Sequence, residues 1–370
     1  MRFLIAAMLL FSSCAPACAQ LVYRGEQTIY EDSLWEGEVR IDGILTVAPE
    51  VRLEIRPGTR VLFTRIDTDG DGLGESELFI QGILAARGTA EAPILFSSAE
   101  LHPVSGDWGA INMMATTEPG ILSHCVVEYA TRGFHAHFAE ASIESSLFRH
   151  NYQAIQFQDA RVTLENLVIE NNRNALQFRD SEAILRDLLI RDNLWAMRSL
   201  YGTIRMERTQ ILGNRLNGLN LRESYLEAEE SLFAGNRRGL YLQDSEARLE
   251  ACRFENNLEH GVLLENSIVS GRANSLSGNG RSGLRFVDSR GELHQGAILD
   301  NGIHSIFNEG ATDADLRFNW WGSLDAARIG ADILDGEDRP GLGLVRIEPI
   351  LEQNPLHRID SIIHIRPDGP

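Results

Sequence analysis

The most regular feature of the chain is a pattern of apolar and polar positions that repeats every 21 or 22 residues between about residues 141 and 307. Each repeat holds three short strand-like runs separated by polar corners, as in Glu182–Ile190 of one repeat. Short apolar runs bounded by polar corners are typical of β-strands, and a period in the low twenties is typical of solenoids. The pattern therefore predicts coils of three short strands, each stacked on the coil before it.

An asparagine recurs at the same place in every repeat. The members of this series are Asn151, Asn172, Asn193, Asn214, Asn236, Asn257, Asn279 and Asn301. In stacked coils such side-chain amides can hydrogen-bond to those above and below, and asparagine tolerates the left-handed backbone of a sharp corner. We therefore predict a structural asparagine ladder, not a catalytic column, and we expect Asn319 to continue it.

Leucine-rich repeats share this period, but they place several leucines around their asparagine and contain a helical half. The repeats of this chain have no helical period. The predicted fold is all-β: a single right-handed parallel β-helix whose strands lie about 4.8 Å apart along the axis. The predicted organisation is a signal peptide (1–19), an N-terminal cap (20–38), the β-helix (39–351) and a C-terminal tail (352–370). We expect Trp35 to pack in the cap, and Trp320 and Trp321 to close the far end.

The N-terminus has the features of an export signal. Arg2 precedes an apolar run from Phe3 to Phe11, and Ala17-Cys18-Ala19 fits a cleavage site. A lipoprotein signal with Cys14 as the anchor is the competing interpretation. Either one predicts an exported protein that is periplasmic, on the outer surface or extracellular. The run is too short to cross a membrane, and the net charge of -19 argues against nucleic acid as a partner.

Two cysteines, Cys125 and Cys252, follow the signal. They are separated by about six coils, or nearly 30 Å along the axis. A disulfide requires Cα atoms within about 7 Å of each other. We therefore predict two free thiols that point inward.

Several motifs in the first coils point to a known group of proteins. They are Pro57–Thr59, Gly82–Thr89, Pro93–Ser98 and Trp108–Ile111, with Asn319-Trp320-Trp321-Gly322 near the end. Together they resemble bacterial secreted right-handed β-helix repeat proteins of the pectin-lyase-like superfamily. The resemblance implies the fold over about residues 39–350. It says little about activity, because this superfamily includes pectate lyases, polygalacturonases, uronate epimerases and non-catalytic surface proteins.

An acidic insertion separates two predicted strands at residues 67–75. Asp67, Asp69 and Asp71 alternate, and Gly72 follows them, as in the first half of a calcium loop. We expect Ca²⁺ bound by Asp67, Asp69, Asp71, the carbonyl group of Leu73, and Glu75. The alternative is a solvated acidic loop without metal, because position twelve of the pattern is Leu78 instead of glutamate.

Three outward columns of side chains follow from the stacking. The column with binding chemistry combines amide, guanidinium and aromatic groups: Gln156, Gln177, Arg198, Asn220, Tyr241 and Arg285. This is the chemistry of a carbohydrate-binding face, although an ordinary exposed sheet is the alternative. A second column is acidic and begins at Glu144 and Glu165, and a third consists of corner acids from Asp159 to Asp288 that we expect to cap turn amides.

The sequence contains neither the paired aspartates with Gly-His-Gly of polygalacturonases nor the Asp-Pro-His-Asp of uronate epimerases. We therefore expect a non-catalytic exported β-helix scaffold that binds a glycan or another envelope component, as a monomer. The alternative is a polysaccharide-active enzyme: a lyase, an epimerase or a hydrolase. Glu207, Arg186 and Glu229, stacked on adjacent coils, are candidates for two-carboxylate chemistry in that case.

Overall fold

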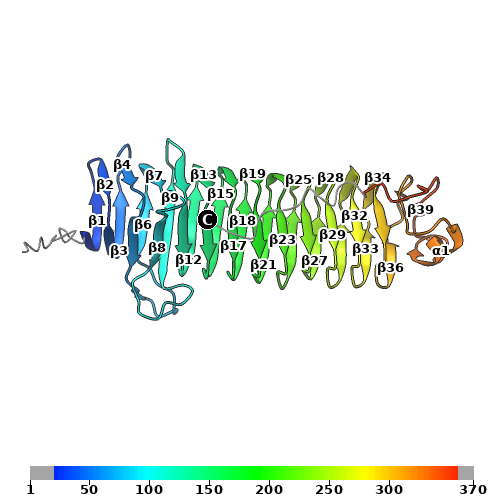
Figure 1. Cartoon of the computed structure of the whole chain (residues 1–370), viewed down its shortest axis with the longest axis horizontal. Helices are drawn as coiled ribbons and strands as arrows, with labels where there is room; N and C mark the ends of the chain where they lie inside the picture. Colours follow the sequence, from blue (N-terminus) through cyan, green and yellow to red (C-terminus); the bar gives the residue numbers. More distant parts are fainter. Residues whose placement is uncertain (1–20, 357–370) are drawn as a thin grey trace, which may run out of the picture.

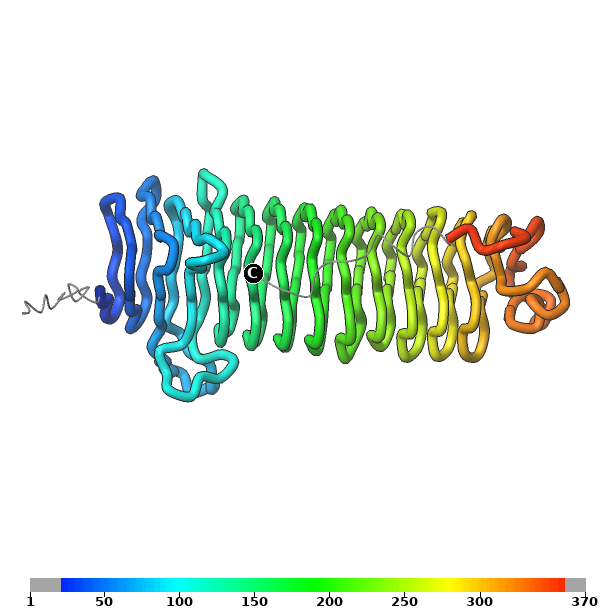
Figure 2. Tube along the Cα trace, viewed as in Figure 1, coloured from blue at the N-terminus to red at the C-terminus, as the bar shows by residue number. Residues whose placement is uncertain are grey.

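The computed structural model describes residues 21–356, so the predicted signal peptide, Cys14 and the last residues of the predicted tail lie outside the described part. The described residues form a parallel β-solenoid of about 13 turns with about 22 residues per turn. The turns are drawn out along one axis, and each lies directly beside the next (Figures 1 and 2). The predicted parallel β-helix is confirmed.

The strands form three faces. The long-strand face consists of β6 (Glu77–Ile80), β9 (Trp108–Met114), β12 (Ala130–His137), β15 (Gln153–Gln158), β18 (Asn174–Arg179), β21 (Trp195–Leu200), β24 (Asn217–Arg222), β27 (Arg238–Gln243), β30 (His260–Glu265), β33 (Ser282–Val287), β36 (His304–Asn308) and β38 (Ile333–Leu334). The short-strand face consists of β5 (Arg60–Phe63), β8 (Ile94–Ser98), β11 (Cys125–Glu128), β14 (Leu147–Arg149), β17 (Val168–Glu170), β20 (Leu189–Arg191), β23 (Gln210–Leu212), β26 (Leu232–Ala234), β29 (Arg253–Glu255), β32 (Ser275–Ser277) and β35 (Ala297–Leu299).

The third face consists of β2 (Ser33–Trp35), β4 (Arg52–Ile55), β7 (Ile83–Arg87), β10 (Gly120–Ser123), β13 (Glu140–Glu144), β16 (Arg161–Glu165), β19 (Glu182–Arg186), β22 (Thr203–Glu207), β25 (Tyr225–Glu229), β28 (Glu246–Glu250), β31 (Ile268–Arg272), β34 (Arg290–His294), β37 (Ala314–Asp315) and β39 (Val345–Arg346). Two further strands, β1 (Leu21–Ile29) and β3 (Glu38–Val47), bend across the corner between the short-strand and long-strand faces. Every strand pairs in parallel with its equivalent one coil away, so residues of like position form columns.

The core is filled by the inward residues of all three faces. Along the short-strand face Phe233 and Phe254 are fully buried and stack with their ring centroids 4.7 Å apart. Cys125 and Cys252 are free and buried, as predicted. Burial raises the pKa of both thiols to about 12, so they remain protonated and act as small core side chains.

The asparagine ladder is present from Asn151 to Asn301. From Asn172 onward, each side-chain oxygen accepts hydrogen bonds from the backbone N–H and the side-chain amide of the asparagine one coil before it, as Asn193 does from Asn172 at 2.8 and 3.1 Å. The oxygen of Asn151 accepts the backbone N–H of Ala130 at 2.9 Å. One detail of the prediction is wrong. The left-handed conformation belongs to the residue before each ladder asparagine, such as His150 (φ 56°) and Asp192 (φ 57°).

The two other corners carry ladders that the sequence analysis missed. At the corner after the long strands the predicted corner acids, such as Asp180 and Asp244, adopt the left-handed conformation. The corner N–H groups are bonded there by serine hydroxyls instead, as in Ser224 N–H to Ser245 at 3.1 Å. Asn319 lies on the remaining corner, where it accepts the N–H of Gly296, so its expected place in the main ladder is wrong.

The two ends of the solenoid differ. The segment expected as an N-terminal cap contains β1 and β2, which form a first coil, with Trp35 buried inside it. At the other end the residues after β36 include Trp321, which is mostly buried, and α1 (Ala326–Ala331), whose N-terminal amides are capped by Asp325. Within residues 21–356 no helix has the length and apolarity that a membrane crossing requires.

Candidate functional site: the long-strand face

The predicted binding residues form a column on the outside of the long-strand face. Gln156, Gln177 and Arg198 are in register on three successive coils. Asn220 and Tyr241 follow on the next two, then Leu263, and then Arg285. The structure therefore brings the six predicted residues together on one surface, and their role in binding stays a prediction.

Arg198 occupies the middle of this surface. Its guanidinium lies 5.1 Å from the centre of the Trp195 ring and donates a hydrogen bond of 3.2 Å to the Gln177 side-chain oxygen. Gln177 also accepts from Gln153 at 3.2 Å. Arg198 makes no ion pair with any residue between 21 and 356. It is therefore a half-buried cation held in place by an amide and an indole.

The later members of the column are already engaged. The Tyr241 hydroxyl donates to Glu265 at 2.7 Å, and burial together with this bond raises the pKa of Tyr241 to about 12. Arg285 forms an ion pair of 2.6 Å with Glu309. The polar members of the column without an acidic partner therefore lie on β24 (Asn217–Arg222) and on the strands before it.

A second polar cluster lies on the first strands of the same face, β6, β9 and β12. The sequence analysis did not predict it. The Asn112 amide donates to Glu77 at 2.8 Å, and its oxygen lies 3.0 Å from Nδ1 of His135. Because that oxygen can only accept, Nδ1 carries the proton and Nε2, which is buried without a partner, is left as an acceptor.

Burial favours the neutral forms of His135 and Glu77. Burial lowers the pKa of His135 to about 4, and the charges of Arg132 and His137 act in the same direction. Burial also raises the pKa of Glu77, against the opposing effects of Asn112 and Arg132. Arg132 makes no ion pair within 4.0 Å of a described carboxylate, although its charge acts on Glu77, so it is a second cation of this face without a direct partner.

The acidic insertion projects from the corner beside the short-strand and long-strand faces. Carboxylate oxygens of Asp67, Asp69 and Asp71 lie within 4.8 Å of one another, and all three residues are exposed. They accept N–H groups of their own loop, as Asp67 does from Gly70 and Gly72 at 2.8 and 3.1 Å. Glu75, an expected ligand, bonds to Thr68 instead. Leu73 places its side chain against Gly106 of the neighbouring loop. Three of the five expected ligand residues are thus brought together through their side chains.

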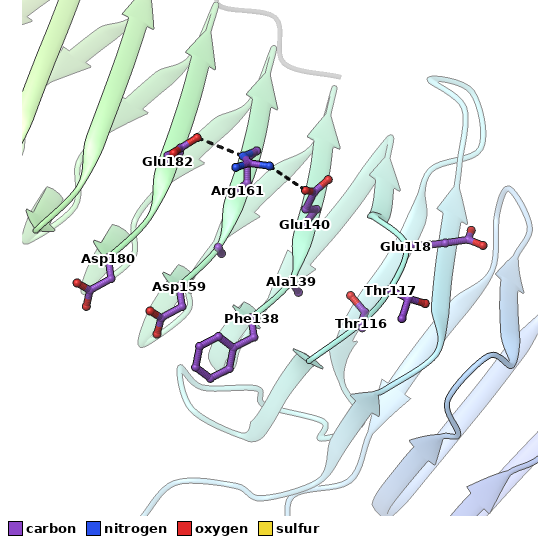
Figure 3. Close-up of a pocket in the computed structure, with 11 residues that line it drawn as sticks. Thr116, Thr117, Glu118, Phe138, Ala139, Glu140, Asp159, Arg161, Asp180 and Glu182 are labelled. Carbon is purple, nitrogen blue, oxygen red and sulfur yellow. Dashed lines mark hydrogen bonds and ion pairs between the residues drawn. The ribbon is translucent and has the colours of Figure 1, made fainter.

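A hollow of about 530 Å³ opens at the corner after β12, β15 and β18 (Figure 3). Arg161 bridges Glu140 and Glu182 across its wall at 3.3 and 3.2 Å. Asp159, Asp180 and Glu118 add three more carboxylates, and Phe138 is exposed at the rim. Because acids outnumber the single arginine, this hollow disfavours an anionic ligand.

The proposed two-carboxylate candidates are surface ion pairs on the third face. Arg186 lies 3.6 Å from Glu207, which also pairs with Arg208 at 3.3 Å. Glu229 continues the column one coil further. Arg186 and Glu207 are partly exposed and Glu229 is exposed, so these groups lie on the open surface of the third face.

Comparison with known proteins agrees with the architecture. Residues 109–320 match the family described as "Right handed beta helix region". No curated protein sequence is significantly similar to the chain.

Several solved structures are similar to the chain at low identity. A periplasmic alginate epimerase shares 13% identity over 89% of this chain and 79% of its own, with a TM-score of 0.33. The catalytic domain of Agl-KA shares 10% over 80% and 62%, with a TM-score of 0.33. A mannuronic acid specific polysaccharide family 6 lyase from human gut microbiota shares 10% over 75% and 79%, with a TM-score of 0.22. At these identities the likeness concerns architecture alone.

Proposed function

The chain belongs to the right-handed β-helix family, and from that premise we propose that it is an exported protein that binds an anionic polysaccharide along the long-strand face between β12 and β21. One observation carries the proposal. In a chain of net charge -19, Arg132 and Arg198 lie on this face without an ion-pair partner among the described residues. By contrast, Arg238 and Arg285 of the same face are paired with Glu259 and Glu309.

The chemistry of the surface fits a sugar chain with carboxylates. Arg132 and Arg198 are three coils apart, or about 14 Å along the axis. Between them stand amides that can bond to hydroxyls, and Trp195 offers an apolar ring beside Arg198. Guanidinium groups bind carboxylates with two parallel hydrogen bonds, which makes both arginines the expected contacts of uronate groups.

Replacing either arginine with glutamine is expected to weaken binding of a polyuronate about tenfold or more, because a hydrogen bond to a charged group contributes about 1.5–3 kcal/mol. Affinity would be measured by calorimetry with polyuronates and with neutral polysaccharides of similar length. Binding of the polyuronate should also weaken as salt is added.

The matched control is Arg248→Gln, which removes an exposed arginine from β28 on the third face. This variant should retain wild-type affinity. Equal loss in all three variants would show that net charge, and not the long-strand face, governs binding. Binding of neutral polysaccharides alone would overturn the proposal.

A polysaccharide-active enzyme is the second candidate function, and His135 is the observation that favours it. His135 is a neutral imidazole oriented by Asn112 and lying near Arg132, and its Nε2 has no partner among the described residues. If binding exposes Nε2, it can accept a proton from a sugar whose carboxylate the arginine holds. The same polyuronates, analysed for new products with wild type and His135→Gln, test this. Products that form equally with both proteins would exclude His135 as the base, and their absence from wild type would leave the binding function alone.

We also propose that the acidic loop at residues 67–75 binds Ca²⁺ through Asp67, Asp69 and Asp71, a set of oxygen ligands that suits a hard cation. Bound metal should stabilise the folded state by about 2.7 kcal/mol at a free concentration 100 times the dissociation constant. Chelation should therefore lower the midpoint of thermal unfolding, and Asp69→Asn should abolish that difference. A midpoint that chelator and added Ca²⁺ leave unchanged would remove the metal from the proposal.

A further inference from the structure

The N-terminal coil leaves a strand edge uncovered. β1 pairs with β3 through one edge, and β2 pairs with β4 through one edge. Among residues 21–356, no strand pairs with the opposite edge of either. A nine-residue edge of unpaired backbone groups is a template for a further strand. The C-terminal coils, in contrast, are followed by Trp321, α1 and β39.

β1 is bent at its centre. Residues 21–24 lie opposite 39–42 on the short-strand side, and residues 26–29 lie opposite 44–47 on the long-strand side. Gly25, with φ 69°, stands at the corner opposite Gly43, with φ 140°. A side chain at Gly43 would collide with the Gly25 carbonyl oxygen, so glycine is required at this bend. A two-fold axis through Gly25 would exchange the two arms of the strand.

The sequence of β1 is self-complementary about that axis. In an antiparallel pair centred on Gly25, the opposed residues are Leu21 with Ile29, Val22 with Thr28, Tyr23 with Gln27, and Arg24 with Glu26. Leu21 and Ile29 lie opposite Val39 and Val47, which are fully buried, so they extend the core columns. Arg24 and Glu26 both face outward. Directly opposed residues in antiparallel strands have Cβ atoms about 4.5–5.5 Å apart. Two ion pairs would therefore form, each between Arg24 of one copy and Glu26 of the other.

We propose that the exposed edges of β1 and β2 form the interface of a head-to-head dimer of this chain, with β1 antiparallel to β1 of a second copy about Gly25. A second copy fits better than an unrelated partner because an isologous interface needs one patch that complements itself. The same axis places β2, centred on Leu34, against its own copy, and Leu34 is 48% exposed.

The groups that form the pairs are available. The Arg24 side chain is 79% exposed and has a single loose ion pair of 3.6 Å with Asp42. Glu26 is exposed and forms no ion pair within the described chain. One existing contact, from the Gln27 amide to the Arg24 carbonyl oxygen at 3.0 Å, would be exchanged for contacts across the interface.

Charge reversal tests the register. The full chain would be examined by sedimentation and light scattering from about 1 to about 100 µM, because dimer formation follows mass action. Wild type is expected to be dimeric at the upper concentrations. Arg24→Glu and Glu26→Arg each place like charges opposite one another, so each should weaken the dimer about tenfold or more. The double variant restores opposite charges and should dimerise like wild type.

The matched control is Arg248→Glu, a charge reversal far from the N-terminal coil, which should leave dimer formation unchanged. Circular dichroism of each variant checks that the solenoid is intact. A wild type that stays monomeric throughout the concentration range would overturn the proposal. A dimer that is insensitive to both single reversals would also overturn it.

Discussion

Asn193→Ala is expected to lower the free energy of unfolding by about 3–5 kcal/mol, because it leaves several buried groups without partners. The Asn193 side chain takes part in five hydrogen bonds. Its oxygen accepts from the backbone and side chain of Asn172, and its amide donates to two carbonyl oxygens and to Asn214. Alanine would orphan the buried N–H of Asn172 and the carbonyl oxygen of Ile169 together.

Denaturant unfolding followed by circular dichroism measures this loss. Because a solenoid unfolds through nearest-neighbour units, the midpoint of the first transition is the relevant quantity. Asn220→Ala is the control, since that amide lies on the outer surface and bonds to no described residue. It should change stability by no more than about 0.5 kcal/mol. Similar losses in the two variants would contradict a structural role for the ladder.

The periodic part of the fold was predictable because stacking ties sequence position to spatial position. Once each coil takes 21 or 22 residues, Gln177 must lie over Gln156, and Arg198 over Gln177. The outer column and the main asparagine ladder follow from counting alone. Neither step needs any knowledge of side-chain contacts.

The cluster around His135 was not predictable in this way. Phe79, Asn112 and His135 occupy equivalent positions, but their spacings are 33 and 23 residues. The insertion at residues 99–107 lengthens the first interval, and a register shift between Arg132 and Phe134 lies in the second. Without a constant period the sequence gives no register, so Glu77, Asn112 and Arg132 could not be placed beside His135. In the sequence, the alternate spacing of His135 and His137 pointed to this cluster, but it did not indicate which residues would lie beside them.

The corners show a second limit. All three corners use a left-handed residue in the repeating coils. In many coils the next side chain accepts a backbone N–H of the coil before it, but Ala160 and Leu167 occupy such positions without a polar side chain. Asn301 follows Ile298 by three residues, and Asn319 follows Leu316 by three, yet they stand on different corners. Local spacing cannot distinguish equivalent corners, and only the count of residues around the whole coil can.

Phe254→Ala in the core is the other change with a large expected effect. Phe254 is fully buried, and its ring is nearly parallel to that of Phe233, at an angle of 7° and a distance of 4.7 Å. Truncating a buried phenylalanine costs about 3–5 kcal/mol, through lost transfer free energy and the cavity that remains. The strands around it are fixed by ladders on three corners, so the site has little freedom to collapse and the upper part of that range is expected.

Phe138→Ala provides the matched control for the same change of side chain. Phe138 is 57% exposed at the corner after β12, so its removal should cost less than about 1 kcal/mol. Phe254→Leu keeps most of the volume and should cost about 1.5 kcal/mol or less. The denaturant midpoint should therefore be highest for wild type and Phe138→Ala, lower for Phe254→Leu, and lowest for Phe254→Ala. If Phe254→Ala unfolded at the wild-type midpoint, the column of stacked inward side chains would not be what holds successive coils together.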